Sequence, residues 1–217
     1  MQLLDAGHIP TAIIEEASPI AEEEKHKFLE RIKGHRVAPT FTELLDGHDI
    51  PHYKVPHHNK KQCRELLQEL NPDLGVLGGT RIIRERILTI PPDGMLNSHP
   101  GLLPEVRGSA SPAWIVYHDI PIGATCHYID PGIDTGDIGA KRTIPVHRGD
   151  TYEKLCWITL VEADRLMTEA VTAWKQSKLT RTPQGDSEHP TFKVPPDEIM
   201  QQVHKKLRDH TYKHYAD

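Results

Sequence analysis

The sequence predicts an α/β protein in which a mostly parallel sheet is flanked by helices. Short apolar runs of strand length alternate along the chain with segments of helical periodicity, an order typical of parallel sheets. Gly and Pro separate most of these runs. A long segment at 150–176 places apolar side chains at three- and four-residue steps, so one of its faces can cover the sheet.

The elements are expected in the following order. The predicted strands are 11–15, 50–55, 74–77, 95–97, 122–129 and 138–146. The predicted helices are 1–6, 18–33, 40–45, 59–70, 84–87, 111–117, 150–176 and 195–211. Ser18-Pro19 opens the second helix, and Asp150 is expected to cap the long one with Glu153 at the capping-box position.

The strand at 95–97 carries the strongest chemical signal in the sequence. Alternate side chains of a strand point the same way, so Asn97 and His99 share one side and Ser98 faces the other. Pro100 cannot donate to a ladder and ends the strand. An amide donor and an imidazole at a strand end can stabilise a developing oxyanion.

A Gly-rich loop supplies the matching carboxylate. Asp134 lies between Gly132 and Gly136 and could orient the imidazole and keep it charged. Asp130 and Asp137 are alternatives for this role. No spacing rule brings any of the three to His99, so the fold must do so.

Taken together, three motifs resemble the 10-formyltetrahydrofolate-dependent formyltransferase family, which includes methionyl-tRNA, sugar N- and glycinamide ribonucleotide formyltransferases. They are Asn97-x-His99, the segment Leu102-Leu103-Pro104 to Arg107-Gly108, and HYIDPGIDTGDI at 127–138. The family commonly has Ser where this chain has Gly101. The third motif is most similar to the sugar and methionyl-tRNA branches.

The resemblance implies a Rossmann-like formyltransferase fold, with Asn97, His99 and Asp134 as the catalytic residues. Formyl transfer from 10-formyltetrahydrofolate to a primary amine is the implied reaction. The residues implied to bind the folate donor are Gly79, Thr80, Arg81, Ile82, Ile83, Leu102, Leu103, Asp130 and Gly132.

Family members carry a strand and a Gly-containing loop before the first predicted helix, and this sequence has neither. We therefore expect the sheet to lack its first strand, with either a gap between the 11–15 and 74–77 strands or another element that covers the exposed edge. The catalytic domain is expected to span 1–182, and 183–217 to form a C-terminal extension with a terminal helix.

Composition limits the partners and the compartment. The 26 basic and 31 acidic residues give a net charge of −5, which argues against nucleic acid and a membrane surface as partners. Three widely spaced cysteines suit a reducing compartment, so we expect a cytoplasmic protein. The sequence leaves a homodimer open.

Other chemistry has weaker support. We expect no metal site, because His57-His58 and His210/His214 lack Cys or carboxylate partners at ligand spacing and are interpreted as solvent-facing. Cys126 beside His127 is interpreted as a small core residue.

Two alternative functions and the acceptor stay open. A hydrolase of the same donor would use water in place of the amine, and an inactive folate-binding module would lack turnover. A nucleotide-sugar amine is the first choice of small-molecule acceptor, followed by another biosynthetic amine.

Overall fold

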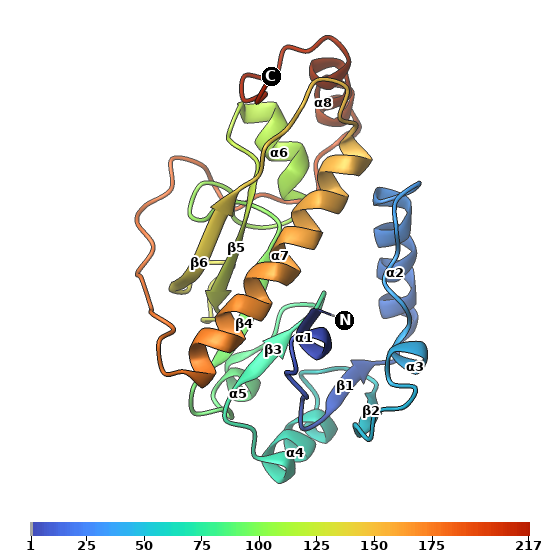
Figure 1. The fold of residues 1–217 in the computed structure, drawn as a ribbon, viewed down its shortest axis with the longest axis vertical. Helices are drawn as coiled ribbons and strands as arrows, with labels where there is room; N and C mark the ends of the chain where they lie inside the picture. The colour runs from blue at the N-terminus through green and yellow to red at the C-terminus, as the bar shows by residue number, and fades with distance from the viewer. Residues whose placement is uncertain (1) are drawn as a thin grey trace. The chain divides into compact units, whose positions relative to one another are not determined.

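The computed structural model describes residues 2–217 and has the α/β composition that the sequence predicts (Figure 1). Its elements follow in chain order: α1 (Gln2–Asp5), β1 (Ile13–Glu16), α2 (Pro19–Arg31), α3 (Phe41–Leu44), β2 (His52–Val55), α4 (Lys61–Leu70), β3 (Gly75–Leu77), α5 (Glu85–Leu88), β4 (Met95–His99), α6 (Ser111–His118), β5 (Gly123–Tyr128), β6 (Ile138–Thr143), α7 (Tyr152–Lys175) and α8 (Asp197–Arg208).

The chain divides into two compact units, Met1–Leu96 and Asn97–Asp217, and the boundary falls within β4. Strands β1 and β2 pair in parallel as a sheet of their own. The other sheet has the order β3-β4-β5-β6, in which β6 runs antiparallel to β5. A missing first strand stays a prediction.

Local sequence signals account for the helix ends of the first unit. Ser18 caps α2 by accepting from the N–H of Ala21, and Thr40 and Glu43 form a reciprocal capping box on α3. Asn71 ends α4 in the left-handed conformation that Asn tolerates well.

The core of the second unit lies between β5 and α7. Every residue of β5 is buried, and α7 packs along this strand (Figure 1). The buried face of α7 consists largely of the apolar positions that the sequence predicts, with Leu155 and Leu166 almost fully enclosed. Burying a side chain of this size contributes about 1.5–3 kcal/mol to folding.

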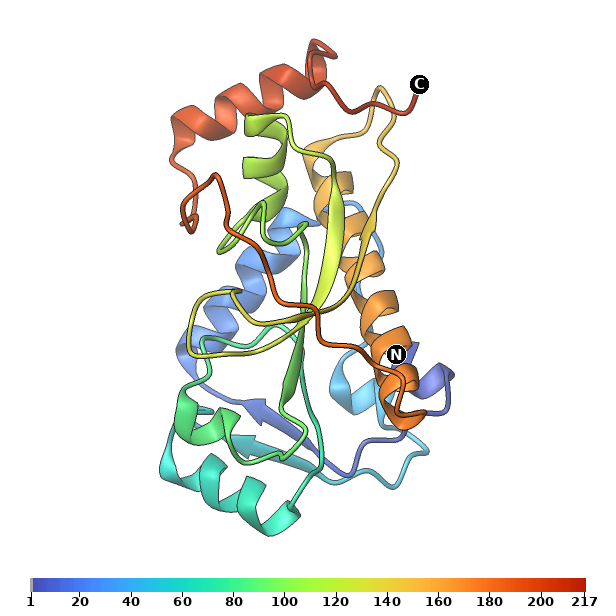
Figure 2. The same cartoon turned by 90° about the vertical axis from the view of Figure 1, so that its left-hand side faces the viewer.

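The C-terminal segment belongs to the second unit. After α7 the chain runs past β6, and α8 then packs against α6 (Figures 1 and 2). Val203 and Leu207 form the buried side of α8. The expected division at 182/183 stays a prediction.

Two sequence-based expectations are wrong. Thr151, not Asp150, caps α7, because the Asp150 carboxylate instead accepts from the N–H of His147 and pairs with Lys154. His57 and His58 are not solvent-facing; both are partly buried beside the Glu16 carboxylate.

His210 and His214 are exposed, as expected. Within residues 2–217, no helix combines the length and apolar character needed to cross a membrane.

Candidate active site

Strand β4 carries the first two predicted site residues at its C-terminal end. Alternation along the strand holds, because the Ser98 hydroxyl donates to the carbonyl of Ala163 on α7, at 2.7 Å. The Asn97 amide instead lies 3.3 Å from Nε2 of His127 on β5. The side chain of Asn97 therefore points to the opposite side of β4 from Ser98 and α7.

The His99 ring is almost fully buried, and its two nitrogens have different surroundings. Nε2 lies 2.7 Å from the carbonyl oxygen of Val106 and 3.0 Å from the hydroxyl of Ser111. The carbonyl can only accept, so Nε2 carries a proton and donates it to Val106. Nδ1 faces Oδ2 of Asp134 at 3.5 Å. A second proton, on Nδ1, would point at that carboxylate.

Gly101 fits closely beside this ring. A Cβ atom at Gly101 would lie 3.1 Å from Nε2 of His99 and 3.1 Å from Cβ of Ser111. Contacts this short require a neighbour to shift. In this chain the hydroxyl next to His99 comes from Ser111, and Gly at 101 leaves room for it.

The loop that carries Asp134 is shaped by its own side chains and glycines. The Asp130 carboxylate accepts from the N–H of Gly132 at 3.1 Å and from the Thr135 hydroxyl at 2.7 Å. A Cβ atom at Gly136 would lie 2.0 Å from the carbonyl oxygen of Tyr128, so only glycine fits there. Asp134 itself has a left-handed backbone, with φ of 53°.

This loop brings Asp134 to three partners. Its Oδ2 atom accepts from the N–H of Gly108 at 2.8 Å and faces His99. Its Oδ1 atom lies 3.6 Å from Nε2 of His127. The Arg107-Gly108 motif thus supplies a backbone donor that fixes the carboxylate.

Sequence reasoning missed His127, which is fully buried between Asn97 and Asp134. Its Nδ1 atom donates to the carbonyl of Tyr128 at 2.9 Å, so in the neutral ring Nε2 can accept from Asn97. Burial lowers the pKa of His127, the His99 charge lowers it further, and Asp134 opposes the shift. The available signal was its place at the start of HYIDPGIDTGDI.

Cys126 is a core residue, as expected. It is fully buried and its sulfur lies 4.0 Å from that of Met167 on α7. Burial raises the pKa of its thiol to about 12, so it is not a reactive thiolate at neutral pH.

The cluster formed by Asn97, His99, His127 and Asp134 combines an oxyanion donor with groups that can move a proton. One Asn97 N–H is directed at His127, which leaves the other available to an oxyanion. Asp134 is more accessible to solvent than its partner His99, because 16% of the Asp134 side chain is exposed against 4% of the His99 side chain. The arrangement can stabilise negative charge and move a proton.

The remaining predicted donor-binding residues of the second unit have structural partners. Leu102 and Leu103 are buried, and the N–H of Leu103 donates to the Thr125 hydroxyl at 3.1 Å. Asp130 and Gly132 hold the loop of Asp134. Their contact with a donor stays a prediction.

In the first unit, the predicted turn at 79–83 follows β3. Gly79 has φ of 62°, and Ile82 is 57% exposed. Buried Asn59 holds the turn, because its amide donates to the Ile82 carbonyl at 2.7 Å and accepts from the N–H of Arg84 at 2.7 Å. Arg81 forms an ion pair with Glu16. The turn's role in donor binding stays a prediction.

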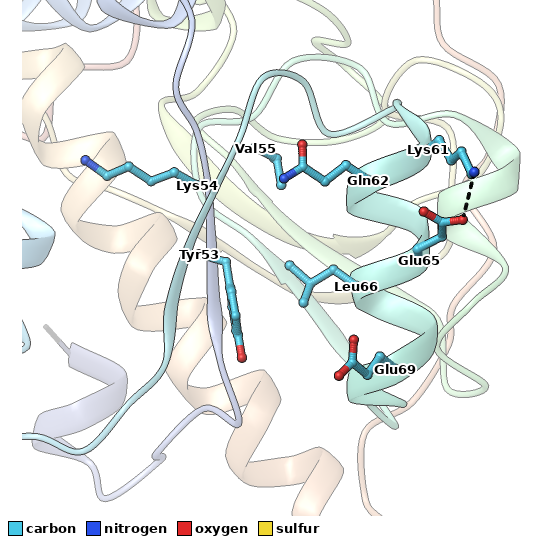
Figure 3. Close-up of a pocket in the computed structure, with 8 residues that line it drawn as sticks. All are labelled: Tyr53, Lys54, Val55, Lys61, Gln62, Glu65, Leu66 and Glu69. Atoms are coloured by element: carbon cyan, nitrogen blue, oxygen red, sulfur yellow. Dashed lines mark ion pairs between the residues drawn. The ribbon is translucent and has the colours of Figure 1, made fainter.

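A hollow of about 510 Å³ lies between β2 and α4 in the first unit (Figure 3). Its lining residues, which include none of the predicted site residues, are Tyr53, Lys54, Val55, Lys61, Gln62, Glu65, Leu66 and Glu69. A large cavity around the cluster stays a prediction. Over residues 2–217, no three His, Cys, Asp or Glu side chains converge as metal ligands.

Comparison with known proteins identifies the family. Residues 3–171 match the family model described as formyl transferase. Methionyl-tRNA formyltransferase of Syntrophus aciditrophicus is 32% identical over 154 residues, which cover 70% of this chain and 49% of the relative. The chain spans about half the length of the curated relatives it matches.

Solved structures share the fold. Glycinamide ribonucleotide transformylase 1 from Symbiobacterium toebii has a TM-score of 0.63 at 24% identity. The alignment covers 84% of this chain and 88% of the transformylase. The formyltransferase PseJ from Anoxybacillus kamchatkensis has a TM-score of 0.61 at 23% identity, with coverage of 76% and 87%. On the match over residues 3–171, the chain belongs to the formyl transferase family.

Proposed function

We propose that this protein transfers the formyl group of 10-formyltetrahydrofolate to a primary amine. The observation that carries the proposal is the convergence of Asn97, His99 and Asp134 in a chain of this family. The PseJ neighbour was solved with tetrahydrofolate, which supports a folate as the donor.

The proposed reaction begins with attack of the amine nitrogen on the formyl carbon. A C–N bond forms, and the carbonyl oxygen becomes an oxyanion that accepts a hydrogen bond from the Asn97 amide. Asp134 takes a proton from the attacking nitrogen, directly or through a water molecule. The bond between the formyl carbon and N10 of the folate then breaks, and N10 receives a proton.

His99 contributes charge and a proton to the same steps. Its Nε2–H is held by the carbonyl of Val106, so a proton on Nδ1 is the one it can share with Asp134 or the oxyanion. In this mechanism the ring carries its second proton while the oxyanion forms and so stabilises that negative charge. None of these steps needs a covalent bond between the formyl group and the enzyme.

We propose a nucleotide-sugar amine as the acceptor. PseJ was solved with a UDP-linked 4-formamido sugar, which supports an acceptor of this class. The net charge of −5 also disfavours long-range attraction of a polyanion such as tRNA. A charged methionyl-tRNA is the competing acceptor.

The test is an amine panel with chromatographic detection of each formylated product. The purified chain is incubated with 10-formyltetrahydrofolate and, separately, a UDP-4-amino sugar, glycinamide ribonucleotide, methionyl-tRNA or no amine. Formylation of the UDP-amino sugar supports the proposal, and formylation of methionyl-tRNA alone overturns the acceptor. Rapid deformylation without amine would identify a hydrolase.

A folate-binding protein without turnover is tested by thermal unfolding. A midpoint raised by 5-formyltetrahydrofolate, together with no product from any amine, would assign binding only and overturn the proposed reaction.

A further inference from the structure

The segment that follows α7 connects the loop at 107–109 with the loop that carries Asp134. Thr182 and Ile138 exchange backbone hydrogen bonds of 2.8 and 3.0 Å, which anchors the segment beside the start of β6. Phe192 then donates to the carbonyl of Arg107 at 2.8 Å and accepts from Ser109 at 2.9 Å. We call residues 182–192 the strap.

Gln184 of the strap connects these loops through one side-chain amide. Its Oε1 atom accepts from Nε and Nη2 of Arg107, at 3.2 and 3.0 Å. Its Nε2 atom donates to the carbonyl oxygens of Asp134, at 3.0 Å, and Gly136, at 2.6 Å. The guanidinium only donates and the carbonyls only accept, so a single orientation of the amide satisfies all four contacts.

The strap also approaches the residue that donates to the Asp134 carboxylate. A Cβ atom at Gly108 would lie 2.1 Å from the carbonyl oxygen of Phe192, and Gly108 has φ of 100°. The same residue donates its N–H to Oδ2 of Asp134. The strap thus binds the backbone carbonyl of Asp134. It also contacts Gly108, whose N–H donates to the Asp134 carboxylate.

We propose that Gln184 is a positioning residue for formyl transfer, because it holds the left-handed backbone of Asp134 in the conformation that directs its carboxylate at His99. This role rests on the proposed function. A backbone with positive φ at a non-Gly residue is sparsely populated, so surrounding contacts must maintain it. Gln184 supplies a donor directly to the carbonyl of that residue.

The test compares Gln184→Glu, Gln184→Met and the control Gln201→Glu. Glu at 184 keeps an acceptor for Arg107 but loses both donors, and it faces two carbonyl oxygens with a carboxylate. Met keeps the approximate length without hydrogen bonds. Gln201 is exposed on α8, so Gln201→Glu reproduces the charge change on the surface of the same unit.

Two readouts separate positioning from a merely structural role. In Gln184→Glu and Gln184→Met, kcat should fall on the order of 10²-fold while the donor KM changes little, as expected when a catalytic group is misplaced. In an Asp134→Asn background the same substitutions should cost much less, because Gln184 acts through the Asp134 side chain. The control should match wild type.

Hydrogen exchange of the Gly108 amide tests the geometry without any activity. The proposal predicts exchange about tenfold faster in Gln184→Met than in Gln201→Glu, because the amide loses its fixed acceptor. Unchanged exchange overturns the proposal, as does a full kcat loss that persists in the Asp134→Asn background. If wild type transfers no formyl group, the proposed function fails and Gly108 exchange alone decides the positioning claim.

Discussion

Oδ2 of Asp134 lies 3.5 Å from Nδ1 of His99, although the two residues are far apart in the sequence. The separation is longer than an ordinary hydrogen bond. The same oxygen accepts from the Gly108 N–H at 2.8 Å. The Gly108 N–H therefore fixes the position of the carboxylate, and the same carboxylate oxygen can accept a hydrogen bond from a proton on Nδ1 of His99.

Gly136→Ala should disrupt the Asp134 loop, because the new Cβ would meet the Tyr128 carbonyl oxygen. We expect a loss of about 1–3 kcal/mol in the free energy of unfolding, together with a lower kcat. Urea unfolding followed by circular dichroism measures the first quantity. Gly185→Ala is the matched control, since a Cβ there meets no atom within 4 Å. Equal stability of the two variants would contradict the steric argument.

His127 should make stability depend on pH. Burial lowers its pKa in the folded chain below the usual 6.5. The unfolded chain therefore binds a proton near pH 6.5 that the folded chain binds only at lower pH. The contribution of neutral His127 to the free energy of unfolding is therefore fully present above pH 6.5. It is lost as the pH falls through the pKa of His127 in the folded chain.

The corresponding variant is His127→Gln. Its free energy of unfolding should fall less steeply than that of wild type on acidification below pH 6.5. The difference in slope can reach about 1.4 kcal/mol per pH unit. His26→Gln, at an exposed position of α2, serves as the control. Identical slopes in wild type and His127→Gln would show that this ring does not resist protonation.

Asn59→Ala should loosen the turn at 79–83, because its partly buried hydrogen bonds to the backbone of Ile82 and of the adjoining Arg84 are lost. Each unsatisfied backbone group costs about 1–3 kcal/mol. If the turn binds the donor, KM for 10-formyltetrahydrofolate should rise several-fold while kcat changes little. Gln68→Ala, at an exposed position of α4, is the control. An unchanged donor KM would exclude the turn from donor binding.

Local sequence rules account for much of the fold. Helical spacing predicts the buried face of α7, and strand alternation places Ser98 opposite Asn97. The sequence prediction names Asp150 instead of Thr151 as the cap of α7, because both are good capping residues. The tertiary partners of Asp150 decide between them.

The site is less predictable, because its members come from distant segments. Helix and strand periodicities cannot bring Asp134 to His99, and the observed contact depends on the loop fixed by Asp130 and Gly136. Gln184 lies in a polar, Pro-containing segment without periodicity, so no sequence pattern marks it. Its role depends on contacts that exist only in the folded chain.

The most direct measurement of the proposed mechanism is single-turnover formyl transfer with the amine that the panel identifies. Asn97→Ala removes the oxyanion donor, and Asp134→Asn removes the proton acceptor at nearly constant shape. We expect each variant to slow the formyl-transfer step by about 10²–10³-fold, with the fold preserved. Gln201→Glu should react at the wild-type rate. A wild-type rate in Asn97→Ala or Asp134→Asn would contradict the assignment of these residues to catalysis.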